Sequence, residues 1–303
     1  MVRISAVVCT HNRAGYLRKA LVSLAGQALP PDQHEIIVVD NASSDETRAV
    51  VQEVAGLPNL HYVYEGVPGL SRARNVGWQA ARGEYVAYLD DDAVASPGWL
   101  AAYLRRFDEF RPAPGSVGGR CMPIWEAPKP EWLSDRLLSH FSVFHWSEAP
   151  AVLRQDQWLS GCNIAYPRRL LEKVGGFGEG LGRTGGSLLG NEENFIRLKL
   201  DALGWPSVYD PGIVVDHHIS ASRLTKEWFR RASFGQGMSE ALMVRLDRRP
   251  SLSSRAAMAL GKIVWSIPRS ALMFAEASDA GRFRRECQVR EVAGFAAGMW
   301  RAS

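Results

Sequence analysis

The chain has 303 residues, of which 46% are hydrophobic and 22% charged, which fits a globular protein and excludes a disordered one. We find no secretory signal core, no uncharged apolar run near the ~20 residues of a membrane span and no paired cysteines, so we expect a cytoplasmic protein without a zinc or disulfide framework. The formal charge of +4 is uneven: residues 245–303 carry a net +6 and the rest a net −2, which argues against a nucleic-acid partner.

The first half predicts buried strands alternating with helices. Residues 4–9 form an apolar run that ends at Thr10-His11-Asn12-Arg13, and apolar residues then recur at helical spacing from Tyr16 to Leu24. The polar turn between them presents backbone N–H groups that favour an anion, or that only begin a helix.

A second strand over 35–39 ends at Asp40, and a third is expected over 60–64. A carboxylate at a strand's carboxyl end lies where ligands bind in such sheets, and it can accept the imide N–H of a base or the hydroxyls of a ribose. Asp45 precedes the predicted helix 47–54 and is expected to cap it.

Glycines open the next segment, and Arg72, Arg74 and Asn75 then lead into a helix ending near Ala81. Arginines at a helix start suit a diphosphate, although cations prefer the carboxyl end of a helix. The conflict with the helix dipole indicates a functional role for these arginines.

A buried strand over 85–89 stops at Asp90-Asp91-Asp92. Three adjacent carboxylates repel one another unless a cation lies among them, and oxygen ligands suit Mg²⁺ or Mn²⁺. By strand alternation we expect the first and third acids to face one side. The alternative is a solvated acidic turn.

The second half is less regular. We expect a helix from Pro97 to Phe110, loops and short helices over 125–146, and a long loop over 175–190. Further helices are expected over 168–174, after Asn191 and from Trp228, and two strands over 205–209 and 213–215. The second of these strands ends at His217-His218.

Four of these segments together resemble the donor half of a family 2 glycosyltransferase. They are V-V-C-T-H-N-R, I-I-V-V-D-N-A-S-S-D, G-L-S-R-A-R-N-V-G and Y-V-A-Y-L-D-D-D-A, in order over about the first hundred residues. The resemblance implies an α/β protein with the GT-A fold: a Rossmann-like mixed sheet flanked by helices, here with a mostly helical C-terminal extension. We expect a donor half over 1–95, an acceptor half over 96–244 and a basic tail over 245–303.

The resemblance also implies roles for individual residues. Those expected at the donor are Thr10, Asn12, Arg13, Asp40, Arg72, Arg74, Asn75, Asp90 and Asp91. A D-x-D motif would give Asp92 and Asp90 to Mn²⁺ or Mg²⁺, with His217, which we favour, or His218 as a further ligand. Trp158, Gly161 and Asn163 resemble the family's G-x-N stretch and are expected at the acceptor.

Glu192 and Glu193 open a helix after the glycine-rich loop. Acids in a first helical turn suit the dipole and can be simple caps. The pair resembles the family's acidic E-D motif, whose second acid is the general base. Glu193 stands in that position in place of aspartate, which leaves open which glutamate reaches the acceptor.

The tail places apolar residues at helical spacing over 255–275, with Lys262 and Arg269 on one side and Pro268 expected to break or kink the helix. Such a helix can lie on an anionic membrane at the inner face, pack on the main domain or form a homodimer.

We expect an inverting, metal-assisted transfer of a sugar from a nucleotide-diphosphate sugar, UDP by default, to an acceptor hydroxyl. One rival is a sugar-1-phosphate nucleotidyltransferase, which would need a glycine-rich loop after the first strand. The other is a non-catalytic nucleotide-sugar binder, in which we would expect other residues in place of the acidic side chains of the two clusters.

Overall fold

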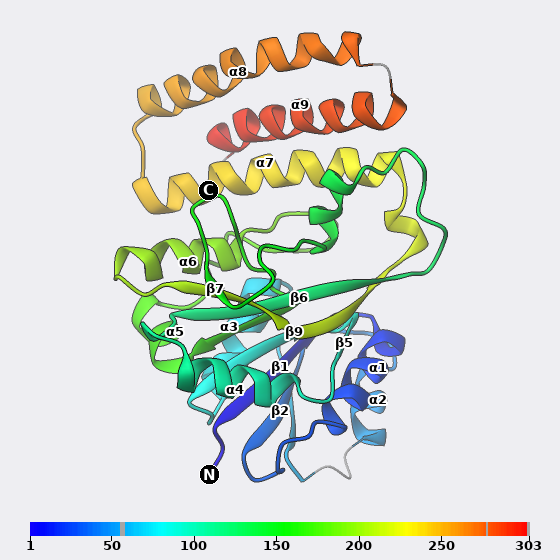
Figure 1. Ribbon diagram of the computed structural model, residues 1–303, viewed down its shortest axis with the longest axis vertical. Coiled ribbons are helices and arrows are strands. Elements are labelled where there is room, and N and C mark those ends of the chain that lie inside the picture. The colour runs from blue at the N-terminus through cyan, green and yellow to red at the C-terminus, as the bar shows by residue number, and fades with distance from the viewer. Residues whose placement is uncertain (55–57, 277, 302–303) are drawn as a thin grey trace. The chain divides into compact units, whose positions relative to one another are not determined.

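The computed structural model describes residues 1–54, 58–276 and 278–301, with 267–275 described by their backbone alone (Figure 1). Its contacts separate two compact units, which cut across the consecutive ranges expected from the sequence. The first unit comprises Met1–Ile124, Ser142–Glu179 and Glu192–His218, and the second comprises Trp125–Phe141, Gly180–Asn191 and Ile219–Ser303.

The first unit is built on a mixed sheet, as predicted. Its parallel strands are β1 (Ile4–Thr10), β2 (His34–Asp40), β3 (Leu60–Tyr64) and β4 (Tyr85–Asp90). The order is β3-β2-β1-β4, so β1 lies between the strands that end at Asp40 and Asp90. Each residue of β2 is buried, as expected for a strand covered on both faces.

Antiparallel strands continue the sheet beyond β4 in the order β8-β6-β9-β5, with β7 also paired to β9. They are β5 (Ala93–Ala95), β6 (Ser116–Trp125), β7 (Ala151–Val152), β8 (Asn163–Pro167) and β9 (Ser207–Ile219). The sequence did not predict β6, and the two strands expected over 205–215 are one.

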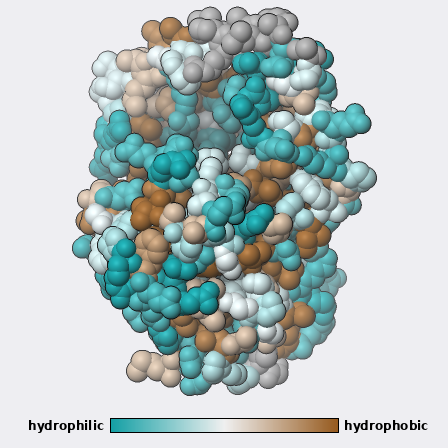
Figure 2. Space-filling view, viewed as in Figure 1, coloured by the Kyte–Doolittle hydropathy of each residue, from teal (hydrophilic) through white to brown (hydrophobic). Residues whose placement is uncertain are grey.

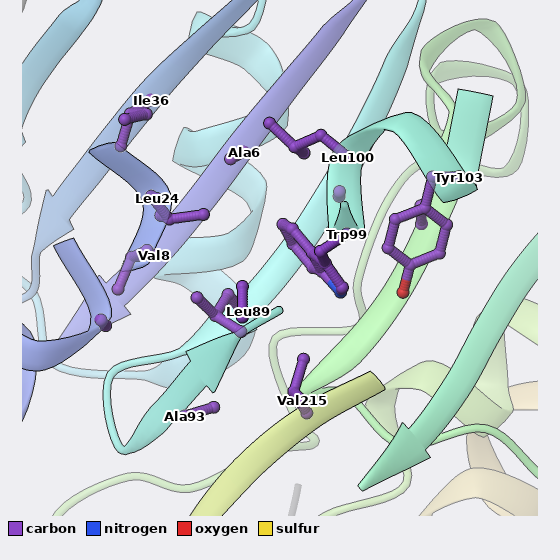
Figure 3. Close-up of a cluster of buried hydrophobic side chains, with 14 of the residues drawn as sticks. Ala6, Val8, Leu24, Ile36, Leu89, Ala93, Trp99, Leu100, Tyr103 and Val215 are labelled. Carbon is purple, nitrogen blue, oxygen red and sulfur yellow. The ribbon is translucent and has the colours of Figure 1, made fainter. Parts of the chain in front are cut away.

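Helices flank this sheet (Figure 1). They are α1 (Ala14–Ala25), α2 (Thr47–Glu53), α3 (Leu70–Ala80), α4 (Trp99–Glu109), α5 (Arg168–Val174) and α6 (Glu192–Ala202). One core cluster packs α1 and α4 against the sheet, with Trp99, Leu100 and Tyr103 beside Leu89 and Val215 (Figure 3). This packing fixes the ends of β1 and β4, where the candidate site lies.

The second unit is mostly helical, as predicted for the extension. It contains the short helices η1 (Asp135–Phe141) and η2 (Ala221–Arg223) and the long helices α7 (Lys226–Arg248), α8 (Leu252–Ala275) and α9 (Asp279–Trp300). Glycine allows α7 and α9 to approach closely, since a Cβ on Gly237 would lie 1.8 Å from the carbonyl oxygen of Glu291. Pro268 does not break the helix, because α8 continues to Ala275.

Candidate active site

The three acids occupy the carboxyl end of β4. Asp91 and Asp92 are 5% and 4% exposed, and Arg13 bridges them, with Nη1 2.8 Å from Asp91 Oδ1 and 2.8 Å from Asp92 Oδ2. Thr10 donates its hydroxyl to Asp91 Oδ2 at 2.9 Å. Two buried carboxylates therefore share one guanidinium at the point where β1 and β4 end.

The electrostatics of this pair oppose full ionisation. Burial raises the pKa of Asp91 to about 6; Arg13 lowers it and the neighbouring Asp92 raises it further. The Arg13 guanidinium thus does not offset the burial of Asp91 beside Asp92, so the protonated form of Asp91 is favoured more than in a solvent-exposed acid.

The orientation of the triplet differs from the expected alternation. Asp91 and Asp92 share Arg13, whereas Asp90 lies 3.2 Å from Arg74 Nη2. The reason is local: β4 ends at Asp90, and Asp91 and Asp92 form a turn before β5, so the alternation of a strand does not extend to them.

The structure distinguishes the two histidines. Pairing of β5 with β9 sets Ala93 opposite His217, and His217 Nε2 lies 3.2 Å from Asp92 Oδ1. The backbone N–H of His218 donates to the Asp92 carbonyl at 2.8 Å, and its ring packs on Tyr16. The His217 imidazole thus lies at the acids, as favoured from the sequence.

A second acidic cluster surrounds Arg74, which α3 carries and which is 2% exposed. Its Nη1 lies 2.5 Å from Glu192 Oε1, and its Nη2 contacts Asp90. Glu193 Oε1 accepts the Gly161 N–H at 2.8 Å. Gly161 has no room for a side chain, because a Cβ there would lie 2.3 Å from Arg74 Nη2. Arg74 thus connects the triplet to the glutamate pair.

The two glutamates have different surroundings. Glu192 is 3% exposed, and burial raises its pKa to about 7; Glu193 raises it further and Arg74 lowers it. Glu193 is partly exposed, but its Oε2 is buried and, like Glu192 Oε2, has no hydrogen-bond partner within the described part of the chain. Each glutamate therefore combines one fixed oxygen with one that can accept a proton, and the two differ in what holds the fixed oxygen.

Two predicted site residues, Asn163 and Asn75, form hydrogen bonds within the fold. Asn163 is 0% exposed: its Oδ1 accepts from Trp99 Nε1 and the Tyr103 hydroxyl, and its Nδ2 donates to the carbonyls of Arg120 and Ile213. In this structure its polar atoms are all used inside the core, and its place at the acceptor stays a prediction.

Asn75 likewise bonds to the chain that follows α5. Its side chain exchanges hydrogen bonds with the backbone N–H and carbonyl of Phe177, and its Oδ1 also accepts from Trp78. In this structure the Asn75 side chain holds the segment at Phe177, and its contact with the donor stays a prediction. Arg72 lies 3.1 Å from Glu65 and 3.7 Å from Glu179 at the same end of α3.

Asp40 is 2% exposed at the end of β2, and both its oxygens accept hydrogen bonds, from the Ser43 N–H and from the Tyr62 hydroxyl. Asn12 has a positive φ of 53° and accepts from the Ser44 N–H at 2.7 Å. These residues join the turn after β1 to the turn after β2.

Asp45 caps more than the one helix expected. It accepts from the backbone N–H and hydroxyl of Thr47, and also from the N–H of Ala14 at the start of α1. Sequence reasoning missed Asn41, whose side chain bonds to the backbone of Glu65, Val67 and Gly69 and so fixes the loop before α3. The sequence could have indicated this role, because Asn41 directly follows Asp40 at the end of a predicted strand.

Trp158 belongs to an aromatic cluster. Its ring lies 4.8 Å from Trp146 and 5.7 Å from Phe144, between centroids, and it is partly exposed. The sequence left open whether such aromatics stack on a sugar or pack in a core, and these contacts show a packed ring with one accessible part.

With this geometry established, comparison with known proteins assigns the family. The family model described as "Glycosyl transferase family 2" matches residues 5–175, more than half of the chain. The chain belongs to glycosyl transferase family 2. It is therefore an enzyme of the glycosyltransferase type that uses a nucleotide sugar.

Relatives and solved structures agree with this family. The chain is 27% identical over 256 residues to the glucosyl-dolichyl phosphate glucuronosyltransferase of Haloferax volcanii, covering 80% of this chain and 77% of that protein. It is also 27% identical to a validoxylamine A glucosyltransferase of Streptomyces hygroscopicus, of which it spans about half (49%). A mannosyltransferase of Pyrobaculum calidifontis, solved with GDP-Man and Mn²⁺, shares the fold with a TM-score of 0.66 at 20% identity, covering 98% of this chain and 87% of that one.

Proposed function

We propose that this family 2 enzyme transfers a sugar from a nucleoside diphosphate sugar, UDP by default, to an acceptor hydroxyl with inversion, and that Glu193 is the general base. The observation that carries the proposal is the separation of two acidic clusters in one unit. Asp91 and Asp92 lie with Arg13 and His217 at the end of β4, whereas Glu193 lies on α6 beside Gly161.

The two clusters fit the two halves of a displacement. Glu193 Oε2 accepts the proton of the acceptor hydroxyl as that oxygen bonds to the anomeric carbon. The bond from that carbon to the diphosphate oxygen breaks on the opposite face, and the nucleoside diphosphate leaves with the bonding pair. An inverting displacement needs its base on the side away from the leaving group.

A divalent cation would be held by Asp92 and Asp90, with His217 as a nitrogen ligand. Their donors fit Mn²⁺ or Mg²⁺, because carboxylate oxygens suit both ions and imidazole suits the former. The local charge also fits, since Asp91 and Asp92 are two buried carboxylates that share the Arg13 guanidinium. No group of three such ligands is already gathered among the residues that the structure describes. The cation would neutralise charge on the leaving diphosphate.

We place the nucleotide along the ends of β1, β2 and β4. Thr10, Asn12 and Arg13 lie at the turn after β1, and Asp40 would accept a base N–H. A carboxylate offers about four acceptor positions, of which Ser43 and Tyr62 use two. Arg72 and Arg74 would lie at the ribose and sugar.

A panel of nucleotide sugars with Mn²⁺ tests the reaction. Release of a nucleoside diphosphate that depends on an added hydroxyl acceptor supports glycosyl transfer. Release of pyrophosphate from a nucleoside triphosphate and a sugar phosphate would instead identify a nucleotidyltransferase. Binding of the nucleotide sugar with neither product would identify a binding protein.

We also propose that α8 lies on an anionic membrane surface. Large apolar side chains on it are exposed: Leu252 (67%), Leu260 (61%), Ile263 (40%), Val264 (55%) and Trp265 (63%). In Figure 2, hydrophobic surface lies over the described part of α8, beside the grey atoms. Lys262, expected on one side of this helix together with Arg269, bonds to Glu240 on α7.

The charges near this face favour lipid over a second copy of the chain. Arg248 and Arg249 are exposed at the turn that leads into α8, and such cations are attracted to acidic headgroups. Tryptophan is enriched at the boundary between lipid and water. Within the described residues no helix is long and apolar enough to cross a membrane, so α8 would lie in the plane of the surface.

A further inference from the structure

Two buried thiols meet inside the first unit. Cys121 lies on β6 and Cys162 directly precedes β8, and their Sγ atoms are 3.1 Å apart. The antiparallel pairing of β6 with β8 brings together these two residues, which stand 41 positions apart in the chain. Both side chains are 1% exposed. The glycosyl transfer proposed above uses neither sulfur.

A buried thiol is ordinarily inert, and a second thiol beside it changes what oxidation can do. A disulfide joins its sulfurs at about 2.05 Å, so bond formation draws the two Sγ atoms together by about 1 Å. Neighbouring strands lie about 4.8 Å apart, within the ~4.4–6.8 Å found between the Cα atoms of a disulfide. The Ser160 hydroxyl lies 3.3 Å from Cys162 Sγ, and Ser160 is itself 9% exposed, so the pair lies near the molecular surface.

Cys162 also belongs to the segment that holds the proposed base. Its neighbour Gly161 donates its N–H to Glu193 Oε1 at 2.8 Å, and a Cβ on Gly161 would lie 2.3 Å from Arg74 Nη2. On the other side of Cys162, Asn163 is anchored by four side-chain hydrogen bonds. A displacement of Cys162 is therefore taken up by Gly161, whose N–H then moves relative to Glu193.

We propose that peroxide converts Cys121 and Cys162 to a disulfide, and that this bond slows glycosyl transfer by displacing Gly161 from Glu193. The modification site stands on the geometry of the two thiols alone. Its effect on turnover rests on the proposed function, because it acts through the general base assigned there. A displacement of about 1 Å can reduce a catalysed rate by about 10²-fold.

The oxidation proceeds in two steps. One thiolate attacks the peroxide, so that a sulfur–oxygen bond forms, the oxygen–oxygen bond breaks and hydroxide leaves with the bonding pair and takes up a proton as water. The second sulfur then attacks the sulfenic sulfur, the sulfur–sulfur bond forms, and the sulfenic oxygen leaves with the second thiol's proton as another water. The two thiols lose two electrons, which reduce the peroxide.

Mass spectrometry of the full chain tests the modification. After treatment with hydrogen peroxide and alkylation of the remaining thiols, non-reduced peptides should show one cross-link, between Cys121 and Cys162, with the loss of two hydrogen atoms. Cys121→Ala and Cys162→Ala should each abolish it. Cys287→Ser, a change at an equally buried thiol on α9, should leave it intact. Unreacted thiols, or sulfinic acid without a cross-link, would overturn the proposal.

Turnover of the same samples tests the effect, with the donor and acceptor that transfer assays select. Peroxide should lower kcat of the wild type by at least tenfold, and dithiothreitol should restore it, which separates the disulfide from methionine oxidation. Cys121→Ala should have the same kcat before and after peroxide, whereas Cys287→Ser should respond as the wild type. An unchanged kcat in the fully cross-linked wild type would overturn the effect on transfer.

Nucleoside diphosphate release by the untreated chain separates the two proposals. Normal release together with no cross-link after peroxide would reject the thiol pair and leave the glycosyl transfer intact. A cross-link in a chain that transfers no sugar would reject the proposed function, and with it the effect on turnover, while confirming the modification site.

Discussion

Glu193 holds one carboxylate oxygen on the Gly161 N–H and leaves the other without a described partner. Glu193→Gln preserves the first contact and removes the proton acceptor, so we expect glycosyl transfer to slow by about 10²- to 10⁴-fold. Glu192→Gln is the matched control and should slow transfer less, since Glu192 is turned to Arg74. Nucleotide affinity should survive in Glu193→Gln; a larger loss in Glu192→Gln would transfer the role of base to that residue.

Glu192 gives a dependence of stability on pH. Its pKa in the folded chain is about 7, above its ordinary value of 4.5. Between these values the folded chain retains a proton that the unfolded chain has lost, so stability falls as the pH rises. Glu192→Gln should therefore lose less thermal stability than the wild type between pH 5 and pH 8. Parallel Tm curves for the two chains would show that Glu192 ionises normally.

Asp92 lies between Arg13 and His217, and Asp92→Asn should remove a metal ligand. In the wild type, EDTA should weaken nucleoside diphosphate binding measured by calorimetry. We expect Asp92→Asn to bind weakly with or without Mn²⁺, whereas Asp108→Asn, a surface change beside Arg3, should behave as the wild type. Equal affinity of the wild type with and without metal would remove the cation from the proposal.

At the scale of single residues, the sequence could group the acids into two clusters but could not give the orientation of each side chain. Buried apolar runs in the sequence show where β1 and β4 end. Because the two strands are parallel, Thr10 and Asp90 could be expected at the same edge of the sheet. Asn163 could not be placed, because its partners Trp99 and Tyr103 lie about sixty residues away and only packing brings them to it.

At the scale of elements, α3 and the segment before β8 meet at Arg74 and Gly161. Gly161→Ala would put a Cβ 2.3 Å from Arg74 Nη2, so the guanidinium would move away from Glu192 and Asp90. We expect glycosyl transfer to fall by at least tenfold, measured as turnover, because each of these contacts is a hydrogen bond between charged groups. Gly15→Ala on α1 meets nothing within 4 Å and should be neutral. Near-normal turnover of Gly161→Ala would show that Arg74 can move without consequence.

The four parallel strands with apolar runs were predicted from the sequence, whereas β5, β6, β7 and β8 were not, and β9 was expected as two strands. β9 passes through Asp210-Pro211-Gly212, a sequence typical of a turn. In the structure Asp210 accepts the Gly212 N–H at 2.9 Å and pairs with Arg106, so the strand continues past the proline. β6 contains adjacent glycines, Gly118 and Gly119, and a Cβ on Gly119 would lie 1.9 Å from the Ile213 carbonyl oxygen. The need for glycine there is a tertiary constraint.

At the scale of the whole molecule, the exposed face of α8 should bring the protein to lipid. Vesicles with acidic lipid should sediment the wild type, and neutral vesicles or high salt should reduce that binding. Leu260→Glu combined with Val264→Glu should abolish it, whereas Val22→Glu, an equally exposed apolar site on α1, should not. Salt-insensitive binding would contradict the charge argument, and a change from dimer to monomer in the double variant would identify a second copy as the occupant.

The register of the parallel strands sets the length of ligand that the site can recognise. Thr10 pairs with Asp40 on one side of β1, and Cys9 pairs with Asp90 on the other. Two strand spacings of about 4.8 Å therefore separate the two acids, so their backbones lie roughly 10 Å apart. A free sugar or a lone diphosphate is too short to reach both ends, whereas a base joined through ribose to a diphosphate is an extended molecule of this size. With Asp40 and Asp90 at the two ends of the donor, as proposed, this backbone spacing, which no side-chain substitution alters, favours a nucleotide over a shorter ligand.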